Sequence, residues 1–342
     1  MTATAIGRVR DLGPGELDWS ADQRLAPDHP FLRHGTWRAF VAGDPPQDVR
    51  VVASVDPRQQ SAAGQVGAIG FIASRGASRS SVSRPTIRAA VAAAESWLVA
   101  GGCSVARCPV QFSTWYGHRV MTDGFPAQGG VAPFPMEPAA IPGLAEAMDE
   151  AGFRVAHVAG SYRIEAERWI EEARLGEALM RASGFRDRAV RVDRLDQELQ
   201  TIHAISIAAF RRSWGFSDIA LDEFLSIYRP LLRLVDPALV RLADSPDGRS
   251  VGFAFAYADP AVPGGRPDAR FIVKSVAVLP EVRRASPGIG TGLAVAVHRL
   301  AAARGYPIAI HACTANDAYT QRVSARSGER FRSYATYEKA LR

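Results

Sequence analysis

Residues 271–306 read FIVKSVAVLPEVRRASPGIGTGLAVAVHRLAAARGY. The first nine residues are mostly β-branched and apolar and are followed by a proline, which predicts a buried strand over residues 271–279. After the glycines, apolar residues recur at spacings of three, four and seven, which predicts a helix over residues 288–304. Gly305 follows as a residue that can end this helix. The predicted order is therefore strand, arginine-rich loop, glycine run and helix.

The glycine run at residues 288–292 has a physical use at the start of a helix. The first backbone N–H groups of a helix lack intrahelical acceptors, and the helix dipole makes that end positive. Glycines leave this backbone open to an anion, and Arg283 and Arg284 add positive charge beside it. A glycine-rich turn can also be purely structural, so the pattern leaves an anion site and a flexible turn as alternatives.

The composition is typical of a protein with a large core. The 342 residues are 47% hydrophobic and 22% charged, and the length favours two domains. No apolar run reaches the length of a membrane span, and the N-terminus lacks the apolar core of a signal peptide. Three cysteines without paired spacing support neither a disulfide framework nor a zinc site. We therefore expect a cytoplasmic protein with no metal and no membrane contact.

The net charge is +6, and almost all of the basic residues are arginine. This charge permits an anionic ligand, but acidic and basic residues alternate along most of the chain. The sequence has no long basic run and no aromatic–basic motif, so nucleic acid is not an expected partner. The glycine spacing is not a dinucleotide fingerprint, and no Walker lysine follows it, so neither a redox enzyme nor an NTPase is indicated.

The same arrangement of elements occurs twice along the chain. The second half has expected strands at 271–279, 307–313 and 331–337, with the helix at 288–304 between the first two. The first half has expected strands at 66–72, 104–111 and 153–164, with a helix at 86–100. This repetition predicts an α/β (α+β) fold of two tandem units, each a mixed central sheet flanked by helices. The predicted boundaries are 1–164 for the first unit, 165–188 for a charged helical connector and 189–342 for the second unit.

The second unit resembles the GCN5-related N-acetyltransferase (GNAT) superfamily in a tandem, two-domain form. The resemblance rests on residues 276–280 (VAVLP), the arginine-rich loop, Gly288-Ile289-Gly290 and the segment HACTAN at 311–316. It implies that acetyl-CoA is the acyl donor, that its pantetheine arm lies between the fourth and fifth strands, and that a small-molecule amine attacks the thioester directly. The donor-binding residues that it implies are Val276, Ala277, Val278, Arg283, Arg284, Gly288, Ile289, Gly290, Thr291, Gly292, Leu293 and Asn316.

Two departures from the family pattern concern the loop and the acid. The loop before Gly288 is about two residues longer than usual, and Pro287 removes one N–H donor. The family often has a tyrosine, which protonates the leaving thiolate, where this chain has Val323-Ser324, and the nearest tyrosine is Tyr319. His311, on the next strand, is the candidate acceptor for the proton of the amine. The alternative for His311 is a hydrogen-bonded structural histidine.

The acceptor site is expected in the region that lines it in the resembled family. The candidate residues there are Trp214, Asp222, Glu223 and Tyr228. The two acids could recognise a cationic acceptor, or they could only complement a helix dipole, and the aromatic residues could equally be core. In the first unit, the loop 75–84 lacks a G-x-G turn, so we expect no CoA there, and the segment 115–118 (WYGH) could line a second pocket.

Three functions are compatible with these patterns. The first is an acyl-CoA-dependent N-acyltransferase, in particular an N-acetyltransferase, acting on a small amine. The second is a non-catalytic tandem module that binds CoA and has a regulatory or scaffolding role. The third is a Fem-like transferase that uses aminoacyl-tRNA, a family that also pairs two such domains. The acceptor, the acyl chain length and the oligomeric state stay open.

Overall fold

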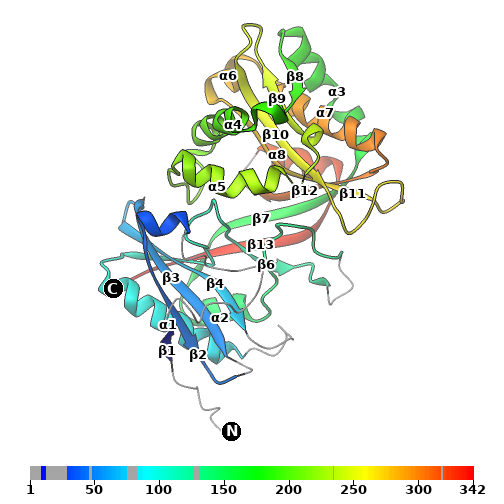
Figure 1. Cartoon of the computed structure of the whole chain (residues 1–342). Coiled ribbons are helices and arrows are strands. Elements are labelled where there is room, and N and C mark those ends of the chain that lie inside the picture. Colours follow the sequence, from blue (N-terminus) through cyan, green and yellow to red (C-terminus); the bar gives the residue numbers. More distant parts are fainter. Residues whose placement is uncertain are drawn as a thin grey trace.

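The computed structural model describes residues 9–12, 29–45, 48–74, 83–126, 131–233, 235–316 and 319–342. Within them, a single mixed sheet runs through the whole molecule in the order β1-β2-β3-β4-β5-β13-β7-β12-β11-β10-β9-β8, and β6 pairs with β13 outside this path. Helices lie against both halves of the sheet (Figure 1). The fold is therefore α/β with a mixed sheet, as predicted.

The first half begins with an antiparallel β-meander that sequence reasoning did not predict. Its elements are β1 (Arg10–Leu12), a 3-10 helix (Pro30–Arg33), β2 (Thr36–Ala42), β3 (Val49–Ser61), β4 (Gly64–Ser74), α1 (Arg84–Ala100), β5 (Val105–Cys108), β6 (Val120–Asp123), α2 (Leu144–Glu150) and β7 (Arg154–Glu165). From β4 onward the expected strands and helix are present, with bounds that differ by a few residues.

The second half repeats this order with more helices. Its elements are α3 (Ala166–Ala182), β8 (Arg186–Ala189), α4 (Leu195–Phe210), α5 (Leu221–Leu232), β9 (Val240–Asp244), β10 (Ser250–Ala258), β11 (Arg270–Val278), α6 (Pro280–Ala285), α7 (Ile289–Ala303), β12 (Ile308–Ala315), α8 (Tyr319–Ser327) and β13 (Glu329–Ala340), with short 3-10 helices at Val192–Arg194 and Pro237–Leu239.

Two segments differ from the sequence-based expectation. The arginine-rich loop contains α6, because Pro280 at the first helical turn has the fixed φ that a helix needs. The end of the expected helical connector is instead β8, which pairs antiparallel with β9 from Arg186–Asp244 to Ala189–Arg241. The strands of the second half therefore begin a few residues earlier than predicted.

The two halves exchange strands across the middle of the molecule. β13, the last strand of the chain, pairs with β5 through Tyr337–Cys108 and with β7 along most of its length. β7, the last strand of the first half, also pairs with β12 through His311–Tyr162. Figure 1 shows β7 and β13 side by side between the halves. The domain boundaries stay a prediction from the repeated order of elements. The hydrogen-bonded sheet is continuous across them.

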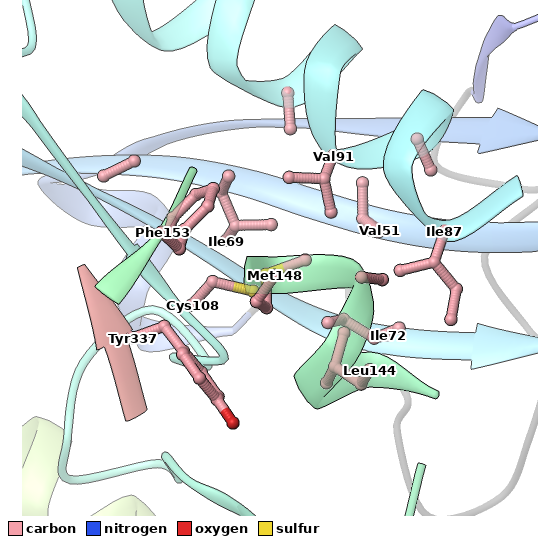
Figure 2. Packing of buried hydrophobic residues seen from close by; sticks show 14 of the residues in the cluster. Val51, Ile69, Ile72, Ile87, Val91, Cys108, Leu144, Met148, Phe153 and Tyr337 are labelled. Carbon is pink, nitrogen blue, oxygen red and sulfur yellow. The ribbon is translucent and has the colours of Figure 1, made fainter. Parts of the chain in front are cut away.

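The hydrophobic cores follow the exchanged strands. Figure 2 shows Tyr337 of β13 packed beside Cys108 and Phe153 in the core of the first half, where α1 contributes Ile87 and Val91. In the second half, α3 and α7 pack on one face of the sheet, and α4 and α5 pack on the other. Burial of these apolar side chains provides the main driving force for folding. It also joins β13, near the C-terminus, to the core of the first half.

Candidate functional site

β11 and β12 separate at the C-terminal end of their pairing. They pair in parallel over four positions, of which the last is Val273–His311. Beyond this pair, among the described strands, β11 pairs only with β10, and residues 314–315 of β12 pair only with β7. Lys274 is an extra residue in the register of β11 against β10, and such a bulge bends a strand. One edge of β11 therefore offers backbone groups to an extended ligand.

The start of α7 lies beside this end of β11. Gly288 is the N-cap residue in the left-handed conformation, with a φ of 100°, and no described side chain caps the first turn. The first N–H groups of α7 therefore lack side-chain acceptors at the positive end of the helix dipole. Arg283 and Arg284 are exposed in the last turn of the preceding α6. This arrangement is suited to an anion.

The three glycines at the start of α7 have different surroundings. A Cβ at Gly288 would lie 2.6 Å from the carbonyl oxygen of Gly176, and one at Gly292 would lie 2.7 Å from the Sδ atom of Met180. These two glycines let α3 pack directly against α7. A Cβ at Gly290 would instead meet only side chains of β11, at 3.6 Å. Gly288 and Gly292 therefore serve close helix packing, whereas the backbone at Gly290 is open.

The residues predicted to bind the donor surround this site. Val276, Ala277 and Val278 form the end of β11, and Asn316 follows β12 on the other side of the separation. Ile289 and Leu293 are buried in the core, so only their backbone can contribute to a ligand site. Thr291 packs against Gly176 of α3. The structure brings these residues together, and their role in binding stays a proposal.

Trp214 is the one of the four predicted acceptor residues that the structure places near the strand separation. It lies in the connection between α4 and α5, and its ring stacks on His157 with centroids 5.2 Å apart and an interplanar angle of 6°. His157 is in β7, two residues before Ala159, which pairs with Ala315 at the end of β12. Trp214 therefore stacks on β7 close to where β7 pairs with the end of β12.

The other three predicted acceptor residues make contacts elsewhere. Asp222, at the start of α5, forms an exposed ion pair with Arg33 of the first half. Tyr228 is packed against Phe224 with ring centroids 4.3 Å apart, and burial raises the pKa of Tyr228 to about 12. Tyr228 is thus part of the packing around α5, and Asp222 helps to hold α5 to the first half.

Glu223 is a buried acid between the two halves. Its Oε1 accepts a hydrogen bond from the hydroxyl of Tyr116 at 2.8 Å, and its Oε2 lies 3.2 Å from both Arg58 and His34. Arg58 also pairs with buried Asp56 at 2.8 Å. Both oxygens of Glu223 have partners in the first half, so this acid links α5 to β3.

His311 is part of a buried histidine pair. Its Nδ1 lies 2.8 Å from Ser324 Oγ of α8, and its Nε2 lies 3.2 Å from Nε2 of His298 in α7. Burial lowers the pKa of both imidazoles, that of His298 to about 4. The ring of His311 also packs edge-on against Trp169 of α3. These contacts suit a residue that positions β12 between α7 and α8. Tyr319 begins α8, but its side chain lies outside the described residues.

The buried histidine pair predicts a loss of stability in mild acid. The unfolded chain binds a proton at His298 with the ordinary pKa of 6.5, whereas the folded chain binds it only near 4. Stability is therefore full above pH 6.5 and falls as the pH decreases. Between pH 7.5 and 5, His298 alone is expected to cost about 2 kcal/mol. Urea unfolding of the wild type and of His298→Phe at both pH values measures this effect. An equal pH dependence in the two proteins would contradict it.

Arg119 has an unusual conformation between β5 and β6. Its φ of 83° lies in the left-handed region that non-glycine residues rarely adopt, and holding a side chain there costs of order 1–3 kcal/mol. Its Nε is buried with no hydrogen-bond partner, and no described carboxylate pairs with its guanidinium. Burial also lowers the pKa of Arg119. Sequence reasoning missed this residue, although the neighbouring segment WYGH was noted.

In the first half, the corresponding separation of β4 from β5 is closed by aromatic rings. The parallel pairing ends near Ala68–Arg107. Phe71 of β4 and Phe112 after β5 then contact each other with ring centroids 4.8 Å apart, and Phe31 stacks on Phe112 at 4.0 Å. All three rings are buried. Most of the expected anion loop of this half, residues 75–82, lies outside the described residues.

The described residues contain no helix that is long and apolar enough to cross a membrane. They also contain no group of three or more His, Cys, Asp or Glu side chains arranged to hold a metal ion.

Comparison with known structures identifies the fold as a tandem GNAT fold. A tandem GNAT protein from the clavulanic acid biosynthesis pathway matches 98% of this chain and 99% of its own, with a TM-score of 0.52 and 12% identity. A GCN5-related N-acetyltransferase from Sphaerobacter thermophilus matches 98% of this chain and 96% of its own, with a TM-score of 0.51 and 15% identity. No model of a protein family matches the chain, and no curated protein matches it in sequence.

A third match lies within a larger protein. The GCN5-related glucosamine N-acetyltransferase region of a fungal multi-domain GH3 β-N-acetylglucosaminidase covers 99% of this chain, with a TM-score of 0.55 and 15% identity, and the chain spans 38% of that protein's length. At these identities the likeness establishes the tandem GNAT fold. The predicted resemblance is thereby confirmed at the level of the fold.

Proposed function

We propose that the protein is an acyl-CoA-dependent N-acyltransferase that transfers an acetyl group from acetyl-CoA to a small-molecule amine. One coincidence supports this proposal most strongly. β11 leaves β12 after Val273, and α7 begins beside the freed end of β11 with uncapped N–H groups at Gly290. An extended pantetheine arm needs a free strand edge, and a pyrophosphate needs a helix N-terminus that it can approach closely.

In this proposal the second half binds the donor. The backbone of residues 276–278 pairs with the pantetheine arm, and the first turn of α7 around Gly290 holds the pyrophosphate. Arg283 and Arg284 neutralise part of its charge, and Asn316 borders the opposite side of the separation. The aromatic contact between Phe71 and Phe112 leaves the first half without an equivalent strand edge, so one donor per chain is expected.

Bound acetyl-CoA supplies an activated thioester. In the transfer, the amine nitrogen forms a bond to the carbonyl carbon, the C–S bond breaks, the electron pair leaves with sulfur, and the amine gives up one proton while the thiolate gains one. The chain contributes mainly by holding the two reactants together in a fixed orientation. Tyr319 remains the proposed proton donor. The buried contacts of His311 suit a residue that holds β12 in place better than a direct proton acceptor.

Titration calorimetry with acetyl-CoA tests donor binding. We expect one acetyl-CoA per chain. Because the ligand binds only the folded state, the free energy of unfolding should also rise by about 2.7 kcal/mol when the ligand concentration is about one hundred times the Kd. Two molecules per chain would place a second site in the first half, and the absence of binding would exclude the proposal. Release of free thiol from acetyl-CoA with a panel of amines then distinguishes a transferase from a CoA-binding module that transfers nothing.

A further inference from the structure

Four side chains from both halves meet beside the strand separation: His118, Arg119, His157 and Trp214. Lys274 of β11 lies near them, and we name the five residues the junction cluster. Nη2 of Arg119 lies 3.2 Å from Nε2 of His157, and Trp214 stacks on His157 with a nearly parallel ring. Arg119, His157 and Lys274 all lower the pKa of His118, after the larger effect of burial. The cluster therefore gathers basic side chains.

The junction cluster lies across the separation of β11 from β12. Lys274 is the bulge residue of β11, directly after the last pair with β12. On the other side, Val158, the neighbour of His157, accepts a hydrogen bond from the N–H of Asn316 at the end of β12. A group held by this cluster would therefore lie close to where the reactive end of the donor leaves the strand edge.

Hydrogen bonds to the connection between α4 and α5 hold Trp214 in the junction cluster. Trp115 Nε1 donates a hydrogen bond to the carbonyl oxygen of Ser217 at 2.8 Å, and Thr114 Oγ1 donates one to that of Gly215 at 3.3 Å. The guanidinium of Arg107 lies 4.8 Å from the centroid of the Trp214 ring and also pairs with Glu338. Both halves therefore contribute to the junction cluster. The Trp214 ring contacts Arg107 and His157, which are both in the first half.

Among the described residues, two cations of the junction cluster have no acidic partner. Arg107 has Glu338 as its partner, but neither Arg119 nor Lys274 forms an ion pair with any carboxylate in the part of the chain that the structure describes. Burying the guanidinium of Arg119 without a carboxylate is unfavourable, and the left-handed backbone of Arg119 adds strain. Both costs would be offset by an anionic ligand, because a guanidinium binds carboxylate or phosphate through two parallel hydrogen bonds.

We infer that the acceptor is an amine that also carries an anionic group, carboxylate or phosphate, and that Arg119 and Lys274 bind this group. This inference rests on the proposed transferase function, for which it names the substrate class. Trp214 then covers the acceptor on the side of the first half. The cationic cluster also disfavours an acceptor whose only charge is the ammonium group.

Matched acceptor pairs test the inference in the full-length protein. Tryptophan and tryptamine differ by a carboxylate, and glucosamine 6-phosphate and glucosamine differ by a phosphate. We expect acetylation of the member that carries the anion in at least one pair with a kcat/KM about 10- to 100-fold above that of the partner that lacks it. The pair that discriminates identifies the anion. Equal rates within both pairs, in a protein that binds acetyl-CoA and acetylates amines, would overturn the inference and leave the transferase proposal intact.

Substitution of Arg119 separates recognition from folding. Asparagine tolerates a positive φ, so Arg119→Asn is expected to raise the KM for the anionic acceptor about 10- to 100-fold while acetyl-CoA affinity stays normal and the melting temperature does not fall. Arg119→Lys should restore part of the affinity. Arg266→Gln removes an exposed arginine that precedes β11 and serves as the control. A lower melting temperature for Arg119→Asn with an unchanged KM would show that Arg119 is structural and overturn the inference.

Discussion

Gly290→Glu is expected to weaken the binding of acetyl-CoA strongly while the protein stays folded. A Cβ at this position meets only side chains of β11 at 3.6 Å, so the backbone can accept a side chain without strain. The glutamate would, however, extend into the space between α7 and β11, and it would bring a negative charge to the proposed pyrophosphate site. We expect the Kd to rise about 100-fold or more, which corresponds to at least about 2.7 kcal/mol.

Two further substitutions separate charge and bulk from the loss of a glycine. Gly290→Ala adds only the Cβ, and alanine favours a helix, so we expect it to weaken binding by less than about threefold. Ala303→Glu adds the same charge at the exposed far end of α7 and should leave the Kd unchanged. Calorimetry of the three variants, with circular dichroism to verify folding, measures the effect. A folded Gly290→Glu protein with the wild-type Kd would exclude this donor site.

Arg332→Met is expected to destabilise the whole chain by about 3–5 kcal/mol. Arg332, in β13, is fully buried, and its Nη1 lies 2.7 and 2.6 Å from the two oxygens of Glu137, which is 2% exposed. The same guanidinium donates to the carbonyl oxygens of Gly124 and Val131. Removing it leaves a buried carboxylate without its cation. Because β13 lies between β5 and β7, we expect both halves to unfold in one transition.

The double variant Arg332→Met/Glu137→Gln tests whether the unpaired charge causes this loss. Glutamine has nearly the same shape without the charge, so the double variant should recover part of the stability of Arg332→Met. Arg266→Met removes an ion pair whose side chains are 62% and 57% exposed, and it should cost less than about 1 kcal/mol. Urea unfolding measures all three. A loss in Arg332→Met no larger than that in Arg266→Met would contradict the prediction.

The regular elements around the donor site could be predicted because their signals are local. The β-branched run of β11, the apolar spacing of α7 and the glycines between them are properties of neighbouring residues. Sequence reasoning did not predict α6, in which Pro280 begins a helix instead of a loop. It also missed the antiparallel meander β1–β3. No predicted helix separates these strands, so the sequence pattern did not reveal them.

The acceptor side could not be predicted in the same way. Asp222 and Glu223 stand at a helix start and have the residue type expected for a cationic acceptor, yet their partners are in the first half of the chain. Arg119 and Lys274 gave no signal, because a single basic residue in a loop or strand is common. They drew attention only in the tertiary structure, where neither forms an ion pair with a described acidic residue.

The sequence by itself determined the order of strand, glycine run and helix, since hydrophobic periodicity and the open N–H groups of a helix start are local properties of the chain. The tandem GNAT fold was implied by the resemblance of this segment to the family. Only the tertiary structure decided that β13 completes the sheet of the first half, that Gly288 and Gly292 pack against α3, and that Arg119 lies beside His157. These contacts join residues far apart in sequence. They are selected by the burial of complementary faces and the pairing of strand edges, and neither can be read from one segment alone.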